Sequence, residues 1–262
     1  MRVVALYRYP VKGFTAEACD ALTVLEEGRI AGDRVLAFRF ANAAVPDGAW
    51  GRKQECVVLM NAPGVARLDV RFDHPSQRLR LALDGAVLAE AGLDPDGRRR
   101  LCAALEDYVL KLRESPLAGH PDRLPLKLVG DGVTPCYQDN EGGHATLHSR
   151  ESLAAVAAAA SNPRLSESRF RSNIAIEGAR AWEELHWFGR RIRIGRVEFE
   201  VVKHKTRCLA THANPRTGKR DIAIMSTLMR AFAQEQPTFA VGMVTRGAGG
   251  EIRLGDNVSL LD

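Results

Sequence analysis

The architecture of this chain centres on residues 190–211, which read RRIRIGRVEFEVVKHKTRCLAT. Apolar and polar residues alternate from position 192 to position 202, a period that predicts a half-buried β-strand. This strand delivers Cys208, with Lys205 and Arg207 close by in sequence, to the start of a turn. Neighbouring cations favour the thiolate over the thiol, and a thiolate at a strand end can hold a metal or carry sulfur. The alternative is a small buried apolar side chain, which is the role of most free cysteines.

Most of the remaining chain is predicted to form short β-strands. The pair Asp84-Gly85 between two apolar runs is a strong hairpin signal. Helical spacing of apolar residues is confined to a few segments, one of which follows Ser149, a residue type that caps helix N-termini. Many short strands with few helices predict an α+β, β-rich fold that is barrel-like rather than doubly wound. The expected helices are 98–113, 150–160 and 225–232, and the expected strands are 3–8, 21–25, 34–40, 66–72, 79–83, 86–88, 126–129, 171–176, 190–202, 239–244, 252–254 and 258–261.

A proline-rich segment divides the chain into two parts. Residues 115–125 contain three prolines and one glycine, which is typical of a connection between folded units. We therefore expect an N-terminal part over residues 1–115 and a C-terminal part over residues 116–262. A chain of 262 residues is long enough for one large domain or for two modest domains that share an interface.

The composition is that of an ordinary globular protein, with 45% apolar and 26% charged residues, so no long disordered segment is expected. The formal charge of +5 comes from lysines and arginines that are scattered among acidic residues. The one basic run, at 98–100, lies beside Asp94 and Asp96, which indicates a solvated loop rather than a nucleic-acid surface. We expect no nucleic-acid partner, because the excess cations suit a pocket for a phosphorylated small molecule.

The cysteines and the N-terminus indicate the compartment. The five cysteines are odd in number, far apart and never spaced as Cys-x-x-Cys, which argues against a disulfide framework, a structural zinc site and a bound iron–sulfur cluster. The first apolar run is too short and too soon interrupted by charge for a signal peptide, and no run approaches transmembrane length. We expect a cytoplasmic protein without a membrane partner, and the sequence leaves the oligomeric state open.

Four motifs occur in an order that suggests a family. They are YPVKG (9–13) with GDR (32–34), RFRSNI (169–174), TRCLAT (206–211) with NPRTG (214–218), and LGDNV (254–258). Together they resemble the MOSC domain, the molybdenum-cofactor sulfurase C-terminal type, and the N-terminal β-barrel segment that precedes it. The resemblance spans nearly the whole chain. It implies a β-barrel-like MOSC domain over residues 116–262, packed on an N-terminal β-barrel-like segment over residues 1–115.

The resemblance also implies a molybdenum cofactor, Mo-molybdopterin, and does not imply pyridoxal phosphate. Cys208 would be the catalytic residue and the protein ligand to the metal. Lys12 and Arg34 would meet the pterin phosphate, and Arg171 and Asn173 would hold the pterin. The other residues implied to bind the cofactor are Gly13, Arg207 and Thr211.

Elementary chemistry is consistent with these implied roles. A thiolate is a soft ligand that suits a redox-active metal, and arginine and lysine together suit a phosphate. Taken singly, each cation has the alternative role of a surface salt bridge, and Asn173 that of a turn residue. The sequence departs from the family at Gly13, where relatives have a small polar residue, at Ser172, where they have proline, and at Ala210, where they have threonine.

The similar enzymes are amidoxime-reducing, N-hydroxylate-reducing proteins. The implied function is therefore a molybdenum-dependent oxidoreductase that reduces N-hydroxylated or N-oxide small molecules. Some bacterial relatives carry a C-terminal ferredoxin domain, which is not expected after Asp262, so electrons would come from a separate flavin or iron–sulfur protein. Two alternatives remain open: Cys208 could carry a persulfide for metal–sulfur cofactor biosynthesis, or the chain could bind the cofactor without chemistry of its own.

Overall fold

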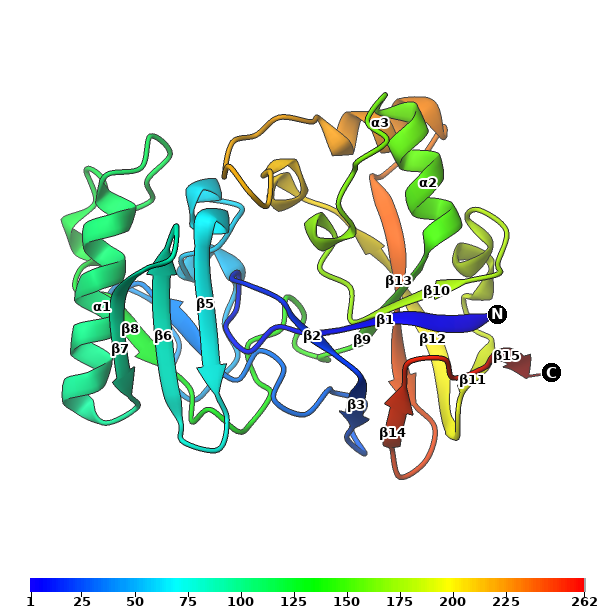
Figure 1. Ribbon diagram of the computed structural model, residues 1–262, viewed down its shortest axis with the longest axis horizontal. Helices are drawn as coiled ribbons and strands as arrows, with labels where there is room; N and C mark the ends of the chain where they lie inside the picture. Colours follow the sequence, from blue (N-terminus) through cyan, green and yellow to red (C-terminus); the bar gives the residue numbers. More distant parts are fainter. Residues whose placement is uncertain (262) are drawn as a thin grey trace.

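The computed structural model describes residues 1–261, and the chain folds into two β-rich halves that lie side by side (Figure 1). One half carries the N-terminus and a large sheet, and the other carries a smaller sheet and a helix. The α+β, β-rich class predicted from the sequence is confirmed.

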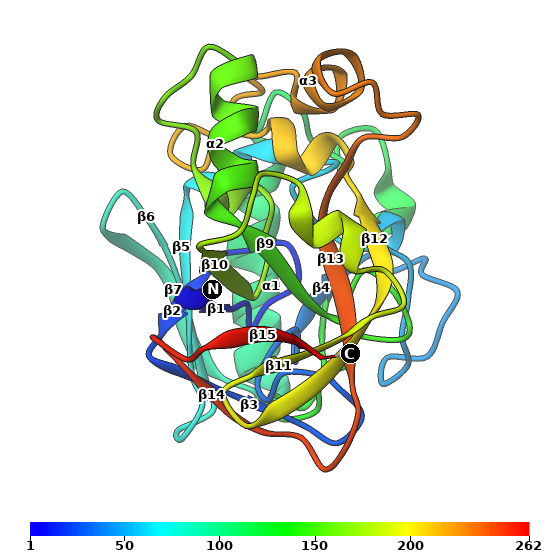
Figure 2. The ribbon, with the colours of Figure 1, turned by 90° about the vertical axis from the view of Figure 1, so that its right-hand side faces the viewer.

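The large sheet has eight strands and is strongly twisted, since β11 and β15 run across the direction of β13 (Figure 2). Only β9 and β10 are parallel, and the other neighbours in the sheet are antiparallel. Among residues 1–261 the edge strands β15 and β2 do not pair with each other, so the sheet is barrel-like without being closed. In spatial order its strands are β15 (Val258–Leu261), β11 (Arg191–Ile194), β12 (Val197–Thr206), β13 (Thr238–Thr245), β9 (Ala145–Ser149), β10 (Ile174–Glu177), β1 (Arg2–Arg8) and β2 (Glu17–Cys19).

Three small sheets complete the β-structure. A three-stranded meander of β5 (Leu68–Asp73), β6 (Arg78–Leu83) and β7 (Ala86–Gly92) packs against the helix α1 (Pro95–Leu110) (Figure 1). The meander turns at Asp84 and Gly85, both at positive φ, as the hairpin signal predicted. The two-stranded sheets are β4 (Ala37–Arg39) with β8 (Lys127–Val129), and β3 (Ala21–Val24) with β14 (Gly250–Arg253).

The helices begin where capping residues allow. The Ser149 hydroxyl accepts a hydrogen bond from the Ser152 amide and starts α2 (Arg150–Ala159), as predicted. The first helix starts three residues earlier than expected, because Asp94 caps it and proline occupies its first position. The third helix, α3 (Ile224–Ala231), lies beside α2 at one end of β13 (Figure 1).

Three strand predictions needed correction. The strand expected at 171–176 is regular only from Ile174, as β10, because Arg171 has a φ of 55°. Residues 190–202 form a hairpin of β11 and β12 rather than one strand, because Gly195 turns the chain at a φ of 57°. Of the strand expected at 34–40, only β4 is regular, since Arg34 itself has a φ of 51°, outside the extended region.

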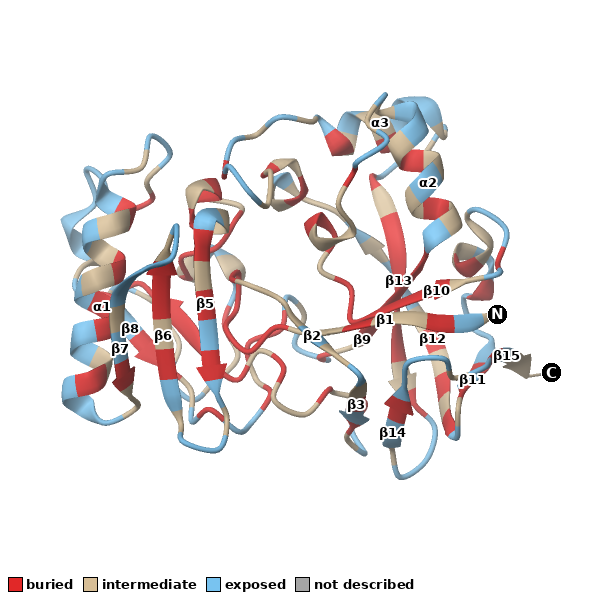
Figure 3. Cartoon of the chain, viewed as in Figure 1, coloured by how far each residue is buried: buried red, intermediate tan, exposed pale blue. Residues whose placement is uncertain are grey.

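Each half has its own apolar core. Buried positions alternate along β5 and β11, whereas β4, β9 and β13 are buried almost throughout (Figure 3). A third cluster joins α2 and α3 to β13, with Phe170 stacked on Phe239 at 3.9 Å between ring centroids. Strand pairing crosses the division predicted at residue 115, because β1 pairs with β10 and β4 pairs with β8. That residues 1–115 and 116–262 form separate domains therefore stays a prediction.

Candidate functional site

A cleft of about 260 Å³ opens beside Cys208 at the junction of the two halves. Cys208 follows the end of β12 in an extended backbone conformation, and its side chain is half-buried. The cleft brings together six residues predicted from the sequence: Arg34, Arg171, Asn173, Arg207, Cys208 and Thr211. A smaller adjoining cavity of about 40 Å³ contains the other two, Lys12 and Gly13, and is also lined by Cys208.

The loop that carries Cys208 is held from two sides. The Thr211 amide and hydroxyl both donate to the Cys208 carbonyl, at 3.0 and 2.9 Å. The buried Arg169 guanidinium donates to the carbonyls of residues 211–213 and pairs with Asp221 at 2.7 Å. Arg169 belongs to the RFRSNI motif, yet nothing in the sequence alone distinguished its buried role from that of any other arginine. The position of Cys208 is therefore set by a rigid loop.

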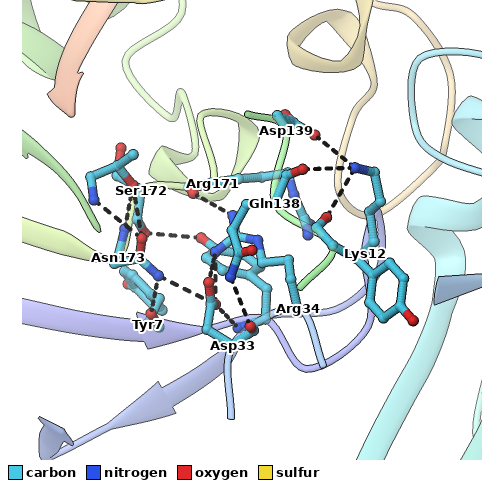
Figure 4. A network of polar contacts seen from close by, with 12 residues as sticks. Tyr7, Lys12, Asp33, Arg34, Gln138, Asp139, Arg171, Ser172 and Asn173 are labelled. Atoms are coloured by element: carbon cyan, nitrogen blue, oxygen red, sulfur yellow. Dashed lines mark hydrogen bonds and ion pairs between the residues drawn. The ribbon is translucent and has the colours of Figure 1, made fainter. Parts of the chain in front are cut away.

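Arg34 and Arg171 come from different halves of the chain and lie over one aromatic ring. Their guanidinium carbons are 4.3 and 4.2 Å from the ring centroid of Tyr9. Arg34 donates to both oxygens of Asp33, at 2.7 and 2.6 Å, and to the Arg171 carbonyl at 3.2 Å (Figure 4). Nη2 of Arg171 is buried and has no hydrogen-bond partner among residues 1–261. The pair therefore has donor capacity left for a ligand.

The Asn173 side chain positions Asp33, the carboxylate that pairs with Arg34. Its side-chain oxygen accepts from the amide and the hydroxyl of Thr146, and its amide nitrogen donates to the Tyr7 carbonyl and to Asp33 (Figure 4). Asn173 is 1% exposed, so these contacts engage the whole side chain. Asn173 lines the cleft, and its hydrogen bond to Asp33 holds that carboxylate beside Arg34.

Lys12 and Gly13 shape the smaller cavity. The buried Lys12 ammonium donates to the carbonyls of Tyr137 and Gln138 at 2.9 and 3.0 Å, and lies 3.7 Å from Asp139 (Figure 4). These contacts anchor the loop before β9. Gly13 has a φ of 87°, and a Cβ there would lie 2.9 Å from the Val58 Cα, so both its conformation and its space require glycine.

The Arg207 guanidinium is hydrogen-bonded to backbone carbonyl groups. It donates to the Phe239 carbonyl at 2.7 Å and to the Phe170 carbonyl at 2.9 Å. Carbonyl groups satisfy its hydrogen bonds without neutralising its charge, so its positive charge still acts on the cleft.

The electrostatics of the cleft favour an anionic ligand. Burial, followed by the Arg34 charge, lowers the pKa of Arg171 to about 10, and burial lowers that of Arg207 to about 10. Burial, followed by the Arg207 charge, lowers the pKa of Lys205 to about 7. Partial removal from water raises the pKa of Asp139, but the surrounding cations, Lys12 foremost, outweigh that effect and bring it to about 2. Burial is the largest cause of the lowered cation values, whereas the excess of positive charge is seen in the lining itself, which holds seven lysines and arginines and one acidic residue, Asp139.

The other cysteines do not line this cleft. Cys56 and Cys102 are buried, Cys19 and Cys136 are half-buried, and all four are free thiols. Burial raises the pKa of each. Over residues 1–261, no helix combines the length and the apolar character needed to cross a membrane.

Comparison with known proteins finds a family model that matches the C-terminal part of the chain. Residues 141–259 match the family model described as the MOSC domain. The match begins in the loop before β9, ends in β15 and includes Cys208. Among solved structures, the YuaD protein from Bacillus subtilis aligns with a TM-score of 0.43 and 12% sequence identity, over 98% of this chain and 93% of that chain.

Proposed function

Residues 141–259 of this chain are a MOSC domain, and from this premise we propose that the cleft binds a molybdenum cofactor. We further propose that the protein is an oxidoreductase that reduces N-hydroxylated or N-oxide small molecules. The observation that carries the proposal is the juxtaposition of Cys208 with an excess of cations, drawn from both halves of the chain, in one cleft.

The residues present fit a phosphate-bearing cofactor with a soft metal. Nη2 of Arg171 is a buried donor without a partner, and Arg34 lies beside it over the same ring of Tyr9, so the two can face one phosphate. Cys208 offers a thiolate within the same cleft, and one protein thiolate suffices if a pterin supplies the remaining sulfur ligands.

The other predicted residues would act on the shape of the site. Lys12 would fix the loop that bears Asp139, Asn173 would hold Asp33 against Arg34, and Thr211 would hold the Cys208 carbonyl. Gly13 would keep the floor of the small cavity open against Val58, and Arg207 would add positive charge without leaving its backbone partners.

When bound, the cofactor supplies two-electron redox chemistry at its metal, which the side chains of this protein cannot supply. The chain would bind and orient the cofactor, exclude bulk water from the deep part of the cleft and leave the rim open to substrate. Electrons would come from a separate flavin or iron–sulfur protein, and we propose a cytoplasmic setting for this exchange.

The second candidate function is a persulfide carrier. It is favoured by one observation: Cys208 is half-buried and lines the open cleft, so a donor persulfide and then an acceptor thiolate could reach it in turn. The Cys208 thiolate would take sulfane sulfur from a donor persulfide, releasing the donor thiolate, and pass that sulfur to an acceptor thiolate.

Metal and pterin analysis of protein from a cofactor-competent host separates these candidates. We expect the wild type to retain pterin and molybdenum, Cys208→Ser to lose molybdenum, and Cys19→Ser, a half-buried cysteine outside the cleft, to match the wild type. The loaded protein should then reduce benzamidoxime with reduced methyl viologen as the electron source. A wild type without pterin or molybdenum, but with one extra sulfur atom on Cys208 by mass spectrometry, would favour the carrier.

Variants of the cations test the phosphate contact. Arg34→Ala should lose pterin, because it removes one of the two guanidinium groups beside Tyr9. Lys12→Ala should lose it less, since that ammonium acts through the loop. Circular dichroism and the unfolding midpoint report whether each variant is folded. Equal pterin retention by folded Arg34→Ala and wild type would rule out the phosphate role.

A further inference from the structure

The rim of the cleft carries a second group of basic side chains that the proposed cofactor site does not use. Lys203 and Lys205 lie on β12, and His144 directly precedes β9. All three line the cleft together with Cys208. Lys203 is exposed and Lys205 is half-buried, so this group reaches from solvent into the cleft.

Unlike the arginines of the cleft, this group has few partners. The Lys205 ammonium makes no hydrogen bond or ion pair with any residue among 1–261, and Nδ1 of His144 is buried without a hydrogen-bond partner in the same range. Lys203 has one long contact, 3.4 Å to the Asn140 side chain. By contrast, Arg34 pairs with Asp33 at 2.6 Å. A half-buried ammonium without a partner is costly unless a ligand neutralises it.

Gly242 provides the space for this group. It lies on β13, directly opposite Lys203 of β12 and Thr146 of β9. A Cβ at this position would lie 3.2 Å from the Lys205 Cδ, 3.2 Å from the His144 Cβ and 3.3 Å from its Nδ1. The φ of Gly242 is not in the left-handed region, so backbone conformation does not require glycine there. Because Gly242 has no side chain, Lys205 and His144 can lie over β13, the strand between β12 and β9.

We propose that Lys203, Lys205 and His144, gathered over Gly242, form an anion-recognition site for the substrate, which would be a small N-hydroxylated molecule bearing a carboxylate or phosphate group. This inference rests on the proposed function and adds the substrate class to it. The site lies at the solvent-open rim, where a ligand can exchange, whereas Arg34 lies deeper with a side chain 14% exposed. The deep pair, Arg34 and Arg171, suits a cofactor that stays bound, and the basic side chains at the rim suit a substrate that exchanges with solvent.

The charges around Lys205 agree with this assignment. Burial, and after it Arg207, Arg34 and Lys203, lower the Lys205 pKa, and Asp139 raises it. The net value is about 7. Burial, with Lys205 and Lys203, also lowers the pKa of His144. A bound anion would reverse both effects, since opposite charge favours the protonated forms.

Titration with inorganic phosphate tests the site without any redox reaction. We expect phosphate to shift the His144 side-chain NMR resonances of the wild type. Lys205→Met and Gly242→Ala should weaken this binding about tenfold or more, as for the loss of one charge-assisted contact. Lys127→Met, at an exposed lysine on β8 outside the cleft, should bind like the wild type. Equal affinity in Lys205→Met and wild type would mean an adventitious ion only, and would overturn the proposal.

The loaded enzyme then distinguishes a substrate anion from the cofactor phosphate. The ratio of KM for 4-carboxybenzamidoxime to KM for benzamidoxime should rise about tenfold in Lys205→Met and stay unchanged in Lys127→Met. An unchanged ratio in Lys205→Met would overturn the substrate assignment. So would loss of pterin from purified Lys205→Met, because the site would then serve the cofactor. If no N–O compound is reduced by the loaded wild type, the proposed function and with it the substrate class fail, while the phosphate titration still decides the anion site.

Discussion

Replacing Lys205 by methionine should stabilise the cofactor-free protein at neutral and acidic pH. The ordinary lysine pKa of 10.5 falls to about 7 in the folded chain, chiefly through burial and then through Arg207. Between these values the unfolded chain binds more protons than the folded one, so wild-type stability rises with pH across this window. Below about pH 7 both states are protonated and the full cost of the unpaired ammonium is present.

The size of the effect follows from that difference. At about 1.4 kcal/mol for each pH unit between the two pKa values, the ceiling is about 5 kcal/mol. Solvent reaches the half-buried ammonium and screens it, so we expect Lys205→Met to gain roughly 1–2 kcal/mol at about pH 6. The gain should shrink as pH rises from about 7 toward 10.5, where the wild-type lysine becomes neutral in both states.

Urea unfolding of cofactor-free wild type, Lys205→Met and Lys127→Met at about pH 6 and about pH 9 measures this directly. The Lys127 variant controls for the loss of one surface charge. Added inorganic phosphate should stabilise the wild type at about pH 6 more than Lys205→Met, because it binds the folded state through that ammonium. A Lys205→Met protein that is less stable than the wild type by the same amount at both pH values would refute the reasoning.

Three further changes test the frame of the site. Arg169→Met should cost roughly 2–4 kcal/mol in unfolding free energy by urea titration, because it leaves the carbonyls of residues 211–213 without their buried donor and removes the ion pair with Asp221. Gly13→Ala should cost roughly 1–3 kcal/mol in the same assay, since its Cβ would meet the backbone of Val58. Glu167, two residues before Arg169, accepts a hydrogen bond from the Tyr7 hydroxyl at 2.6 Å and lies 3.4 Å from His148. Burial raises its pKa, but His148 and Tyr7 outweigh this and hold it at about 2, so its stabilisation is lost as pH falls from about 4.5 toward 2. Glu167→Gln should remove roughly 1–3 kcal/mol at neutral pH and flatten that acid dependence.

Each of these predictions has a control and a contrary result. Arg191→Met, at an exposed arginine of β11, should change stability little, and equal losses at positions 169 and 191 would contradict the buried role. Gly85→Ala tests positive φ in open space, so a larger loss there than at Gly13 would contradict the packing argument. An acid unfolding curve of Glu167→Gln that parallels the wild type would exclude Glu167 as its source.

Local patterns in the sequence predicted local structure well. The hairpin at Asp84 and Gly85 and the helix after Ser149 depend on side chains a few residues apart, so the sequence contains the whole interaction. The pairing of β1 with β10 could not be predicted in this way. A seven-residue strand carries no signal for a partner more than 160 residues away.

The candidate site shows the same division. The motif resemblance alone predicted that Cys208, Arg34 and Arg171 share one site. It could not tell which cations have free donors, because that depends on carbonyl groups elsewhere in the chain. The carbonyls of residues 137 and 138 accept from Lys12, and none within residues 1–261 accepts from the Lys205 ammonium. The ring of Tyr9 under both arginines was also unpredicted, although Tyr9 stands in the first motif.

The position of β1 has a consequence for how the protein is made. Strand β1 is synthesised first, but its sheet neighbour β10 begins at Ile174. At roughly 5–20 residues per second of translation, the first strand leaves the ribosome roughly 10–30 s before its partner. The large sheet therefore cannot assemble in the order of synthesis, and we expect the junction that holds Arg34 beside Arg171 to form only after β10 has left the ribosome.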